Sequence, residues 1–360
     1  MISVLFDAHF LGTPYSGNGR YTRSLLAAMQ DRALVHPEFV ITPYGPPLEC
    51  GDKSLGAYVG VKGGRLARIW SAGGLAKDSS IDIHHSQYTM PITGHFKRCL
   101  TIHDAAFARR ELSDYSLAKV LAFRHFACRA DAVITGSHAA REDLERVLPS
   151  SCPPIQVVYD GCSLGPYSSA EEGLLQELLS GHGRPYILYI GRLSRRKRVP
   201  LLIQGFDEFR RSHGGTLVMV GDHDDDTPRI SSLLKGRRDR DIVWLHTVPE
   251  GLKAALLKTC DAFVYLSEYE GFGLPIAEAM LARVPVVVAK TPALIEIGGG
   301  MAVQVDAHPV AVSEGIAAAV FDTATRTIDE AYQIATGYSW EATAAQTMEI
   351  YRALVGGTPH

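Results

Sequence analysis

The sequence lacks the features that mark membrane-spanning, secreted and fibrous proteins. No window approaches about eighteen uncharged apolar residues, so no transmembrane helix is expected. The segment 1–11 lacks a basic n-region and a cleavage site, and Asp7 interrupts its apolar run, which argues against a signal peptide. No heptad array, internal repeat or low-complexity tail occurs. These absences predict a soluble cytoplasmic protein.

The sequence also lacks closely spaced cysteine pairs and a large net charge. The formal net charge of −3 gives no basic domain or stripe, so no nucleic-acid partner is expected. No C-x-x-C pair is present, and most cysteines lie among apolar or small residues, so we expect buried free thiols in a reducing compartment rather than disulfides or zinc ligands. The six cysteines are Cys50, Cys99, Cys128, Cys152, Cys162 and Cys260.

The chain alternates short apolar runs with helical patterns, which is typical of an α/β fold with parallel sheets. At 360 residues it is long enough for two domains, each with its own core. Residues 43–80 are poorly patterned, and we expect loops there around a short helix near 66–76. The expected strands are 2–6, 81–85, 99–102, 131–135 and 155–158 in the first half, and 186–190, 216–220, 242–245, 262–266, 284–289 and 302–305 in the second.

The most informative stretch is 267–285, which combines a glycine loop with a helix start. It follows the expected strand 262–266, passes Gly271 and Gly273, and enters a helix at Pro275. Such a helix directs its unpaired N–H groups at the C-terminal edge of the sheet, where anionic ligands bind. A ligand site at this loop is therefore expected.

Two carboxylates flank this glycine loop. Glu278, placed in the first turn of the helix, either complements the helix dipole or contacts a ligand. Glu270 precedes the helix, beside glycines that let the backbone approach a ligand closely. A carboxylate there can accept hydrogen bonds from sugar hydroxyls while the neighbouring N–H groups donate to phosphate.

A cationic segment, 191–198, follows the expected strand 186–190. Such a charge run is usually a solvated surface, but this one lies between a strand end and a helix. A pyrophosphate needs cations at such a place, and Arg192 and Lys197 are the candidates. The neighbouring arginines stay unassigned.

Two further motifs lie in the first half. His103 and Asp104 follow the strand 99–102, where a histidine is either packed in the core or directed at a ligand. The loop 12–20 contains Gly17 and Gly19. A dinucleotide fingerprint would need glycine at position 22, where Thr22 stands, so this loop is either a different ligand loop or an ordinary flexible connection.

Together these motifs resemble the retaining nucleotide-sugar glycosyltransferases of family 4, which have the GT-B fold. The match rests on an E-x7-E pattern from Glu270 to Glu278, a G-R-x-x-x-x-K pattern at 191–197, an H-D pair at 103–104 and an S-G-x-G-R-Y-T pattern at 16–22. The resemblance covers most of the chain and implies two Rossmann-like domains that face each other across a cleft. It places them at residues 1–165 and 166–338, with a C-terminal helix in 339–360 that returns to the first domain.

The resemblance also implies a role for each motif. Arg192 and Lys197 would neutralise the donor diphosphate, and Glu278 would hold the ribose. His103 would face the donor sugar from the opposite domain, with Asp104 on the acceptor side. The implied catalytic residues are His103, Glu270, Arg192 and Lys197. The implied donor-binding residues are Gly17, Gly19, Arg192, Lys197, Val248, Glu270, Gly271, Phe272, Gly273, Leu274 and Glu278.

Two positions stand apart from this pattern. The acidic loop 222–226 offers carboxylates and a histidine to a metal, but the resemblance implies a solvated loop and no metal or cofactor. Asp160 stands where the family usually has asparagine, and we expect this difference to affect the interdomain linker more than function. Residues 62, 65 and 68 are basic, which is either a solvated face or a surface toward the acceptor or a membrane.

The implied activity is retaining transfer of a hexose from a nucleotide-diphospho sugar to an acceptor hydroxyl, without a metal. Similarity to bacterial mannosyl- and rhamnosyltransferases, through residues 6–11 and 16–22, favours a GDP-sugar over UDP- or TDP-sugars. The acceptor would be a glycan, a lipid-linked glycan or a small molecule in polysaccharide or glycoconjugate biosynthesis, in the cytoplasm or at the inner face of the membrane. The alternatives are a non-catalytic nucleotide-sugar-binding subunit and a GT-B nucleotide-sugar epimerase or hydrolase.

Overall fold

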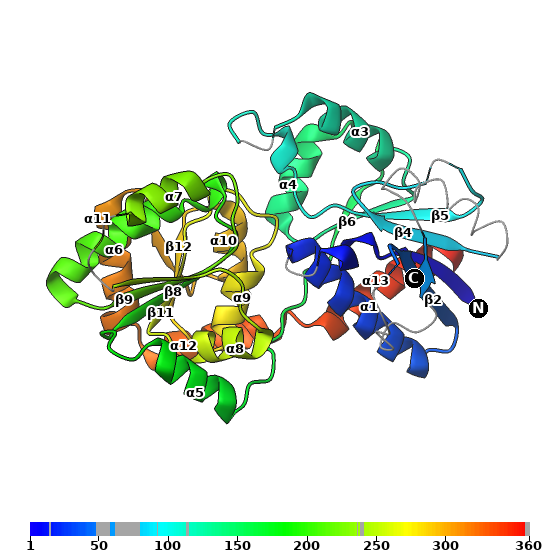
Figure 1. Ribbon diagram of the computed structural model, residues 1–360. Coiled ribbons are helices and arrows are strands. Elements are labelled where there is room, and N and C mark those ends of the chain that lie inside the picture. The colour runs from blue at the N-terminus through cyan, green and yellow to red at the C-terminus, as the bar shows by residue number, and fades with distance from the viewer. Residues whose placement is uncertain are drawn as a thin grey trace. The chain divides into compact units, whose positions relative to one another are not determined.

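The chain folds into two compact units, which are described separately. A computed structural model describes residues 1–13, 16–47, 58–61, 80–91, 93–112, 115–235, 237 and 241–356. Unit 1 comprises Met1–Gly161 and the C-terminal segment from Tyr338, and unit 2 comprises Cys162–Gly337 (Figure 1). The sequence analysis placed these boundaries after residues 165 and 338. The helix expected near 66–76 and the basic residues 62, 65 and 68 lie outside the described residues.

Unit 1 is built on a seven-stranded parallel sheet with the order β3-β2-β1-β4-β5-β6-β7. Its strands are β1 (Ile2–Asp7), β2 (Phe39–Gly45), β3 (Val59–Gly60), β4 (Ile83–Gln87), β5 (Lys97–Thr101), β6 (Ala132–Thr135) and β7 (Ile155–Val157). The sequence analysis missed β2. This strand contains Pro43 and the exposed Val40, so its apolar pattern is broken, although Pro43 pairs in register with Phe6 of β1.

The helices of unit 1 flank this sheet. They are η1 (His9–Gly12), α1 (Gly17–Val35), η3 (Ala106–Ala108), α3 (Leu117–Ala127), α4 (His138–Val147) and α13 (Trp340–Gly356). Ser137 is the N-cap of α4, and its hydroxyl accepts a hydrogen bond from the Ala140 N–H at 3.0 Å. Strands β5 and β6 pack with α3 and α4 around Leu100, Phe123 and Leu144.

Gly17 and Gly19 belong to the first turn of α1, so their placement in a loop extending to Arg20 was wrong. The helix begins early because the Ser16 side chain caps it, accepting from the Gly19 N–H at 3.0 Å. A Cβ on Gly19 would stand 2.2 Å from the carbonyl oxygen of Thr13, so this turn needs glycine. A Cβ on Gly17 would meet no atom within 4 Å.

Helix α13 packs onto the rest of unit 1, chiefly against α1. The Tyr351 hydroxyl contacts Nδ1 of His85 in β4, and both side chains are buried. The hydroxyl of Thr343 donates to the carbonyl of Tyr159 at 2.8 Å. Trp340 lies so close to Gly161 that a Cβ there would stand 2.5 Å from the indole ring. These contacts tie the C-terminal helix to the sheet of unit 1.

A disulfide joins Cys128 and Cys152, so the expectation of free thiols was wrong for this pair. Cys128 caps the C-terminus of α3, and Cys152 lies in the turn between α4 and β7. The spacing of 24 residues gave no signal, since only the packing of α3 and α4 against one core brings the two together. Cysteine usage therefore no longer argues for a reducing compartment. Cys99, Cys162 and Cys260 are buried thiols outside any disulfide, as expected, and Cys50 lies outside the described residues.

Unit 2 contains a six-stranded parallel sheet with the order β10-β9-β8-β11-β12-β13. Its strands are β8 (Tyr186–Ile190), β9 (Thr216–Val220), β10 (Ile242–Leu245), β11 (Ala262–Tyr265), β12 (Val286–Ala289) and β13 (Val303–Val305). All six expected strands are confirmed. Continuous apolar runs mark β8, β9, β11 and β12, most of whose residues are buried. The strand order reverses between β8 and β11, where ligands of such sheets bind.

Helices cover both faces of this sheet. They are α5 (Ser169–Leu178), η4 (Arg195–Lys197), α6 (Val199–His213), α7 (Thr227–Leu234), α8 (Glu250–Thr259), α9 (Leu274–Leu281), α10 (Pro292–Ile297), α11 (Pro309–Ala317), η5 (Ala318–Asp322) and α12 (Thr325–Thr336). Helices α6 and α11 pack together on one face, and α5, α8, α9 and α12 form the layer on the other (Figure 1). Pro292 begins the short helix α10, where its missing N–H costs no intrahelical hydrogen bond.

Close packing of α6 against α11 predicts a stability effect at Gly205. A Cβ at this position would stand 2.4 Å from Cγ1 of the fully buried Val312. We expect Gly205→Ala to lower the free energy of unfolding by about 1–3 kcal/mol, measured by urea denaturation. The matched control is Gly173→Ala on the exposed side of α5, where no atom lies within 4 Å of an added Cβ. The control should gain about 0.4–1 kcal/mol, and equal stabilities of the two variants would contradict the packing argument.

Candidate functional site

Two loops meet at the point where the strand order of unit 2 reverses. The first follows β8 and contains η4 with Arg196 and Lys197, and the second follows β11 and contains Glu270. Because β8 and β11 are parallel neighbours, both loops leave the same edge of the sheet. Backbone bonds join them, since the Glu268 N–H donates to the carbonyl of Arg196 at 2.7 Å. The two loops thereby bring Lys197 and Glu270, which are far apart in the sequence, into contact.

Lys197 and Glu270 form an ion pair that is almost removed from solvent. The Lys197 ammonium donates to Oε1 of Glu270 and to the Tyr265 hydroxyl, and Tyr265 donates to the same Oε1 at 3.2 Å. Only 9% of the Lys197 side chain and 11% of the Glu270 side chain are exposed. The guanidinium of Arg196 lies 3.5 Å from the other carboxylate oxygen.

This environment fixes the charge of Glu270. Burial alone would raise its pKa, but Lys197 and Arg196 outweigh burial and lower the pKa to about 2. Glu270 is therefore a carboxylate at neutral pH, held between two cations. Arg196 and Tyr265 were not predicted as site residues. A tyrosine at the end of a strand gave no signal, and Arg196 was indistinguishable from its charged neighbours.

The start of helix α9 lies directly after Glu270 in the chain. Gly273 caps the helix with φ +106°, and a Cβ there would stand 2.9 Å from the Leu294 side chain, so glycine is required. Pro275 occupies the first helical turn as expected. Gly271 and Phe272, both buried, complete the loop, and Leu274 is the first residue of the helix. The first N–H groups of α9 are thus presented just beyond the ion pair.

The expectation that Glu278 lies in the first turn of α9 was wrong. The helix begins at Leu274, which places Glu278 one turn later, and its side chain is buried. Its Oε1 lies 3.4 Å from Nζ of Lys253 in α8, which is also buried and 2.7 Å from Glu250. Glu278 is therefore a buried, paired carboxylate. Val248, half-buried, lies between β10 and α8.

Arg192 contacts the acidic loop 222–226 rather than the Lys197–Glu270 pair. Its side chain is 63% exposed, and its Nε lies 3.0 Å from Oδ2 of Asp224 in this loop. Asp225 likewise faces Arg195, and its carboxylate accepts from the Arg195 N–H at 2.9 Å. The expectation of a wholly solvated acidic loop was wrong for Asp226, which is 4% exposed and whose pKa is raised by burial.

One group of described side chains could hold a metal ion. Ligand atoms of Asp222, His223 and His246 all lie within 4.8 Å of one another, and the three side chains are exposed. The rings of His223 and His246 stack at 4.9 Å beside Trp244, whose Nε1 donates to the carbonyl of Gly221. Three such ligands would suit a transition metal, but they lie on the surface rather than with Lys197 and Glu270.

His103 lies in unit 1, after β5, and is nearly buried. Its Nε2 is 2.9 Å from Oε1 of Gln87, and its Nδ1 is 3.9 Å from Oδ2 of Asp160. Burial lowers the pKa of His103 to about 4 and raises the pKa of Asp160 to about 7. Asp160 was expected to affect mainly the linker, and its carboxyl also faces His103. Asp104 accepts a hydrogen bond from the Ala106 N–H at 3.1 Å and forms a local turn.

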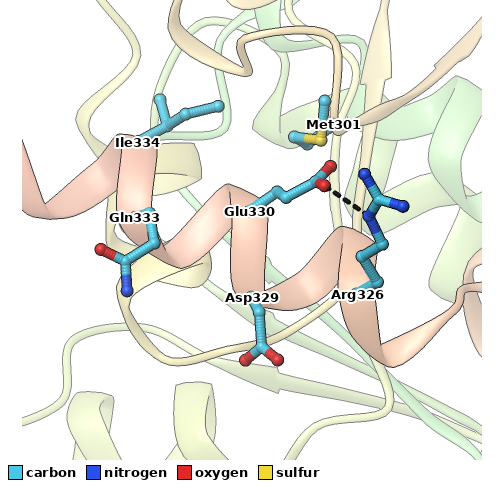
Figure 2. Close-up of a pocket in the computed structure, with 6 residues that line it drawn as sticks. All are labelled: Met301, Arg326, Asp329, Glu330, Gln333 and Ile334. Carbon is cyan, nitrogen blue, oxygen red and sulfur yellow. Dashed lines mark hydrogen bonds and ion pairs between the residues drawn. The ribbon is translucent and has the colours of Figure 1, made fainter.

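A surface hollow of about 630 Å³ lies away from these strand ends, along α12 (Figure 2). Met301 and Ile334 give it an apolar lining. Arg326 donates a hydrogen bond to Glu330, one turn along α12, at 2.8 Å. Asp329 pairs with Arg283. The hollow presents no buried polar group to a ligand, so we do not assign the site there.

Comparison with known families agrees with the motifs. Residues 15–165 match the family model described as Glycosyltransferase Family 4, and residues 171–317 match the one described as Glycosyl transferases group 1. The chain belongs to this family of glycosyltransferases. The resemblance inferred from the E-x7-E and G-R-x-x-x-x-K patterns is confirmed.

Curated relatives share the family over part of their length. O-antigen chain mannosyltransferase B of Escherichia coli is 30% identical over 259 residues, which are 70% of this chain and 62% of the relative. Alpha-maltose-1-phosphate synthase of Mycolicibacterium smegmatis is 28% identical over 252 residues, which are 62% of this chain and 63% of the relative. The chain thus spans less than two thirds of the length of these relatives.

Solved structures confirm the GT-B fold. Sucrose-phosphate synthase from Thermosynechococcus elongatus has a TM-score of 0.82 at 18% identity, covering 99% of this chain and 100% of that one. The Anabaena protein HepE, solved with UDP and glucose, has a TM-score of 0.75 at 17% identity, covering 97% of this chain and 99% of that one. Among the described residues, no helix of the glycosyltransferase combines the length and apolarity needed to span a membrane.

The lowered pKa of Glu270 predicts a dependence of stability on acid. Because the folded pKa lies below the unfolded value of 4.5, the pair stabilises the fold above about pH 4.5 and ceases to do so as pH falls toward 2. Glu270→Gln should therefore cost about 3 kcal/mol at pH 6. This deficit, measured by urea denaturation, should shrink steadily from pH 5 to pH 3.

The control for this experiment is Glu268→Gln in the same loop. Glu268 is exposed and lies 3.4 Å from Arg198, and such surface pairs contribute about 0–1 kcal/mol. Its effect should stay small at every pH. A Glu270→Gln deficit that does not change with pH would show that the carboxylate is not held by the two cations.

Proposed function

We propose that the protein transfers a hexose from a nucleotide-diphospho sugar to an acceptor hydroxyl, with retention at the anomeric carbon and without a metal. The buried Lys197–Glu270 pair at the strand-order reversal, followed by the start of α9, is the observation that supports this most strongly. It combines a fixed cation, a fixed carboxylate and N–H donors at one place. A sugar bearing a diphosphate needs all three.

Charge stabilisation is the main catalytic contribution of this site. As the bond from the sugar to the diphosphate breaks, negative charge develops on the leaving phosphate. The ammonium of Lys197 and the N–H groups of α9 are already ordered, so they stabilise this charge without reorganising. Glu270, ionised beside Lys197, would accept hydrogen bonds from the sugar hydroxyls. The backbone of Gly271, Phe272, Gly273 and Leu274 would line the sugar and phosphate.

Arg192 would join the phosphate by exchanging partners. In the structure it faces Asp224 at 3.0 Å in an exposed ion pair, and such pairs contribute about 0–1 kcal/mol. A diphosphate carries more charge than one carboxylate and should therefore displace Asp224. Lys197 would then act from a buried position and Arg192 from a solvated one.

The remaining assignments rest on the family resemblance. Glu278 and Val248 would contact the nucleoside, and Gly17, Gly19 and His103 would contribute from unit 1, with Asp104 on the acceptor side. The Escherichia coli relative named as a mannosyltransferase favours GDP-mannose or a similar GDP-sugar. The UDP found in the Anabaena protein makes a UDP-sugar the main alternative, followed by a TDP-sugar. The acceptor would be a glycan, a lipid-linked glycan or a small molecule, reached in the cytoplasm or at a membrane surface.

Lys197→Ala tests the donor site. Loss of a charged hydrogen bond to phosphate should weaken binding of the cognate nucleoside diphosphate by about 1.5–3 kcal/mol in calorimetry, and donor turnover should fall with it. The control is Lys290→Ala, which removes an exposed lysine bound to Asp306 and should leave affinity unchanged. Unchanged affinity in a folded Lys197→Ala protein, checked by circular dichroism, would exclude a phosphate role for this lysine.

Chelation tests metal independence. Because Lys197 and Arg192 supply the positive charge that a metal would bring, EDTA should leave the rate of transfer within about twofold of its original value. His246→Ala, which removes one of the three possible metal ligands, should behave like the unmodified protein in the presence and absence of EDTA. An EDTA-sensitive rate that recovers on adding a divalent cation would overturn the proposal of metal-free transfer.

A further inference from the structure

Unit 1 contains a buried carboxyl group that the proposed transfer does not yet use. Asp160 follows β7 and His103 follows β5, and β6 lies between these strands in the sheet. Both residues therefore lie at the carboxyl edge of one sheet. Gly136, which follows β6, leaves room for the Asp160 carboxyl, because a Cβ at position 136 would stand 3.1 Å from its Oδ1. Only 8% of the Asp160 side chain is exposed.

A chain of hydrogen bonds determines which nitrogen of His103 carries the proton. The Thr22 hydroxyl donates to the carbonyl of Asn18 at 2.7 Å, so it must accept the bond from Nε2 of Gln87, also at 2.7 Å. The amide of Gln87 is thereby oriented with its oxygen toward His103, 2.9 Å from the ring Nε2. That nitrogen is the donor. In the neutral ring, Nδ1 then carries a lone pair and faces Asp160.

The groups around this pair are uncharged at neutral pH. Tyr21 of α1 lies edge-on to His103 at 4.4 Å, and its pKa is raised by burial and by Asp160. Tyr88, after β4, lies at 5.9 Å. Burial lowers the pKa of His85 in β4 to about 3. Within the described part of the chain, His103 is the only basic group recorded within ion-pair distance of Asp160.

We propose that Asp160 is a positioning residue for His103, because its carboxyl faces Nδ1 and stabilises the ring in the tautomer that donates from Nε2 to Gln87. If the carboxyl were ionised, the 3.9 Å between Oδ2 and Nδ1 would separate a carboxylate and a lone pair in a buried site, which is unfavourable. The raised pKa of Asp160, about 7, agrees with a proton on the carboxyl. A ring fixed in this way presents a constant surface to the ligand.

The consequence for activity rests on the proposed function, in which His103 serves the donor sugar. As pH rises through about 7, Asp160 loses its proton, and the contact with Nδ1 changes from attraction to repulsion. The value of kcat/KM should therefore fall on the alkaline side, by about tenfold between pH 6 and pH 8.

Two substitutions separate positioning from simple burial. In Asp160→Asn the amide keeps an N–H donor toward Nδ1 but does not ionise, so kcat/KM should stay within about threefold of the original at pH 6 and should not fall by pH 8. Asp160→Leu has similar bulk but no donor, and it should lose at least tenfold at both pH values. An alkaline decline that persists unchanged in Asp160→Asn would overturn the proposal.

Nitrogen-15 NMR of histidine-labelled protein tests the same idea without turnover. The His103 signal, assigned by its loss in His103→Asn, should show the neutral ring protonated at Nε2 at pH 6, and it should shift with an apparent pKa near 7. This shift should be absent in Asp160→Asn, and Asp160→Leu should show mixed tautomers. A doubly protonated ring at pH 6 would refute the proposal. If no nucleotide sugar supports turnover, the proposed function fails, and the NMR result still decides the role of Asp160.

Discussion

The ion pair between Lys197 and Glu270 is the constraint on which the site of unit 2 depends. Taking two charges out of water is costly, and either one alone would destabilise the fold. The pair is stable only because the loops after β8 and β11 meet, with Tyr265 and Arg196 completing the contacts. The strand order that places β8 beside β11 therefore determines where the charges lie. The same pair gives the loops a fixed geometry before any ligand arrives.

The two units use opposite electrostatic solutions. In unit 2, cations keep Glu270 ionised although it is buried, which suits a site that must respond to phosphate charge. In unit 1, burial lowers the pKa of His103 and raises that of Asp160, and hydrogen bonds through Gln87 and Thr22 fix the ring. A neutral surface of this kind suits contact with sugar hydroxyls.

Much of the fold could be predicted from the sequence, because buried parallel strands are written as continuous apolar runs. The strands of unit 2 were visible for this reason, and Pro275 marked the first turn of α9. Contacts that depend on spatial neighbours were not. The bond between Cys128 and Cys152 and the approach of Asp160 to His103 need the sheet order, which spacing does not give. Strand β2 was hidden because Pro43 interrupts its pattern.

The measurement that tests the central claim most directly is thermal unfolding of the glycosyltransferase in the presence of GDP, UDP, TDP, ADP or a nicotinamide dinucleotide. The charged site of unit 2 should bind one nucleoside diphosphate selectively, and at one hundred times its Kd this ligand should stabilise the fold by about 2.7 kcal/mol. The responding base would also identify the donor. Stabilisation by the dinucleotide alone, or by none of the five, would contradict a preformed donor site at Lys197 and Glu270.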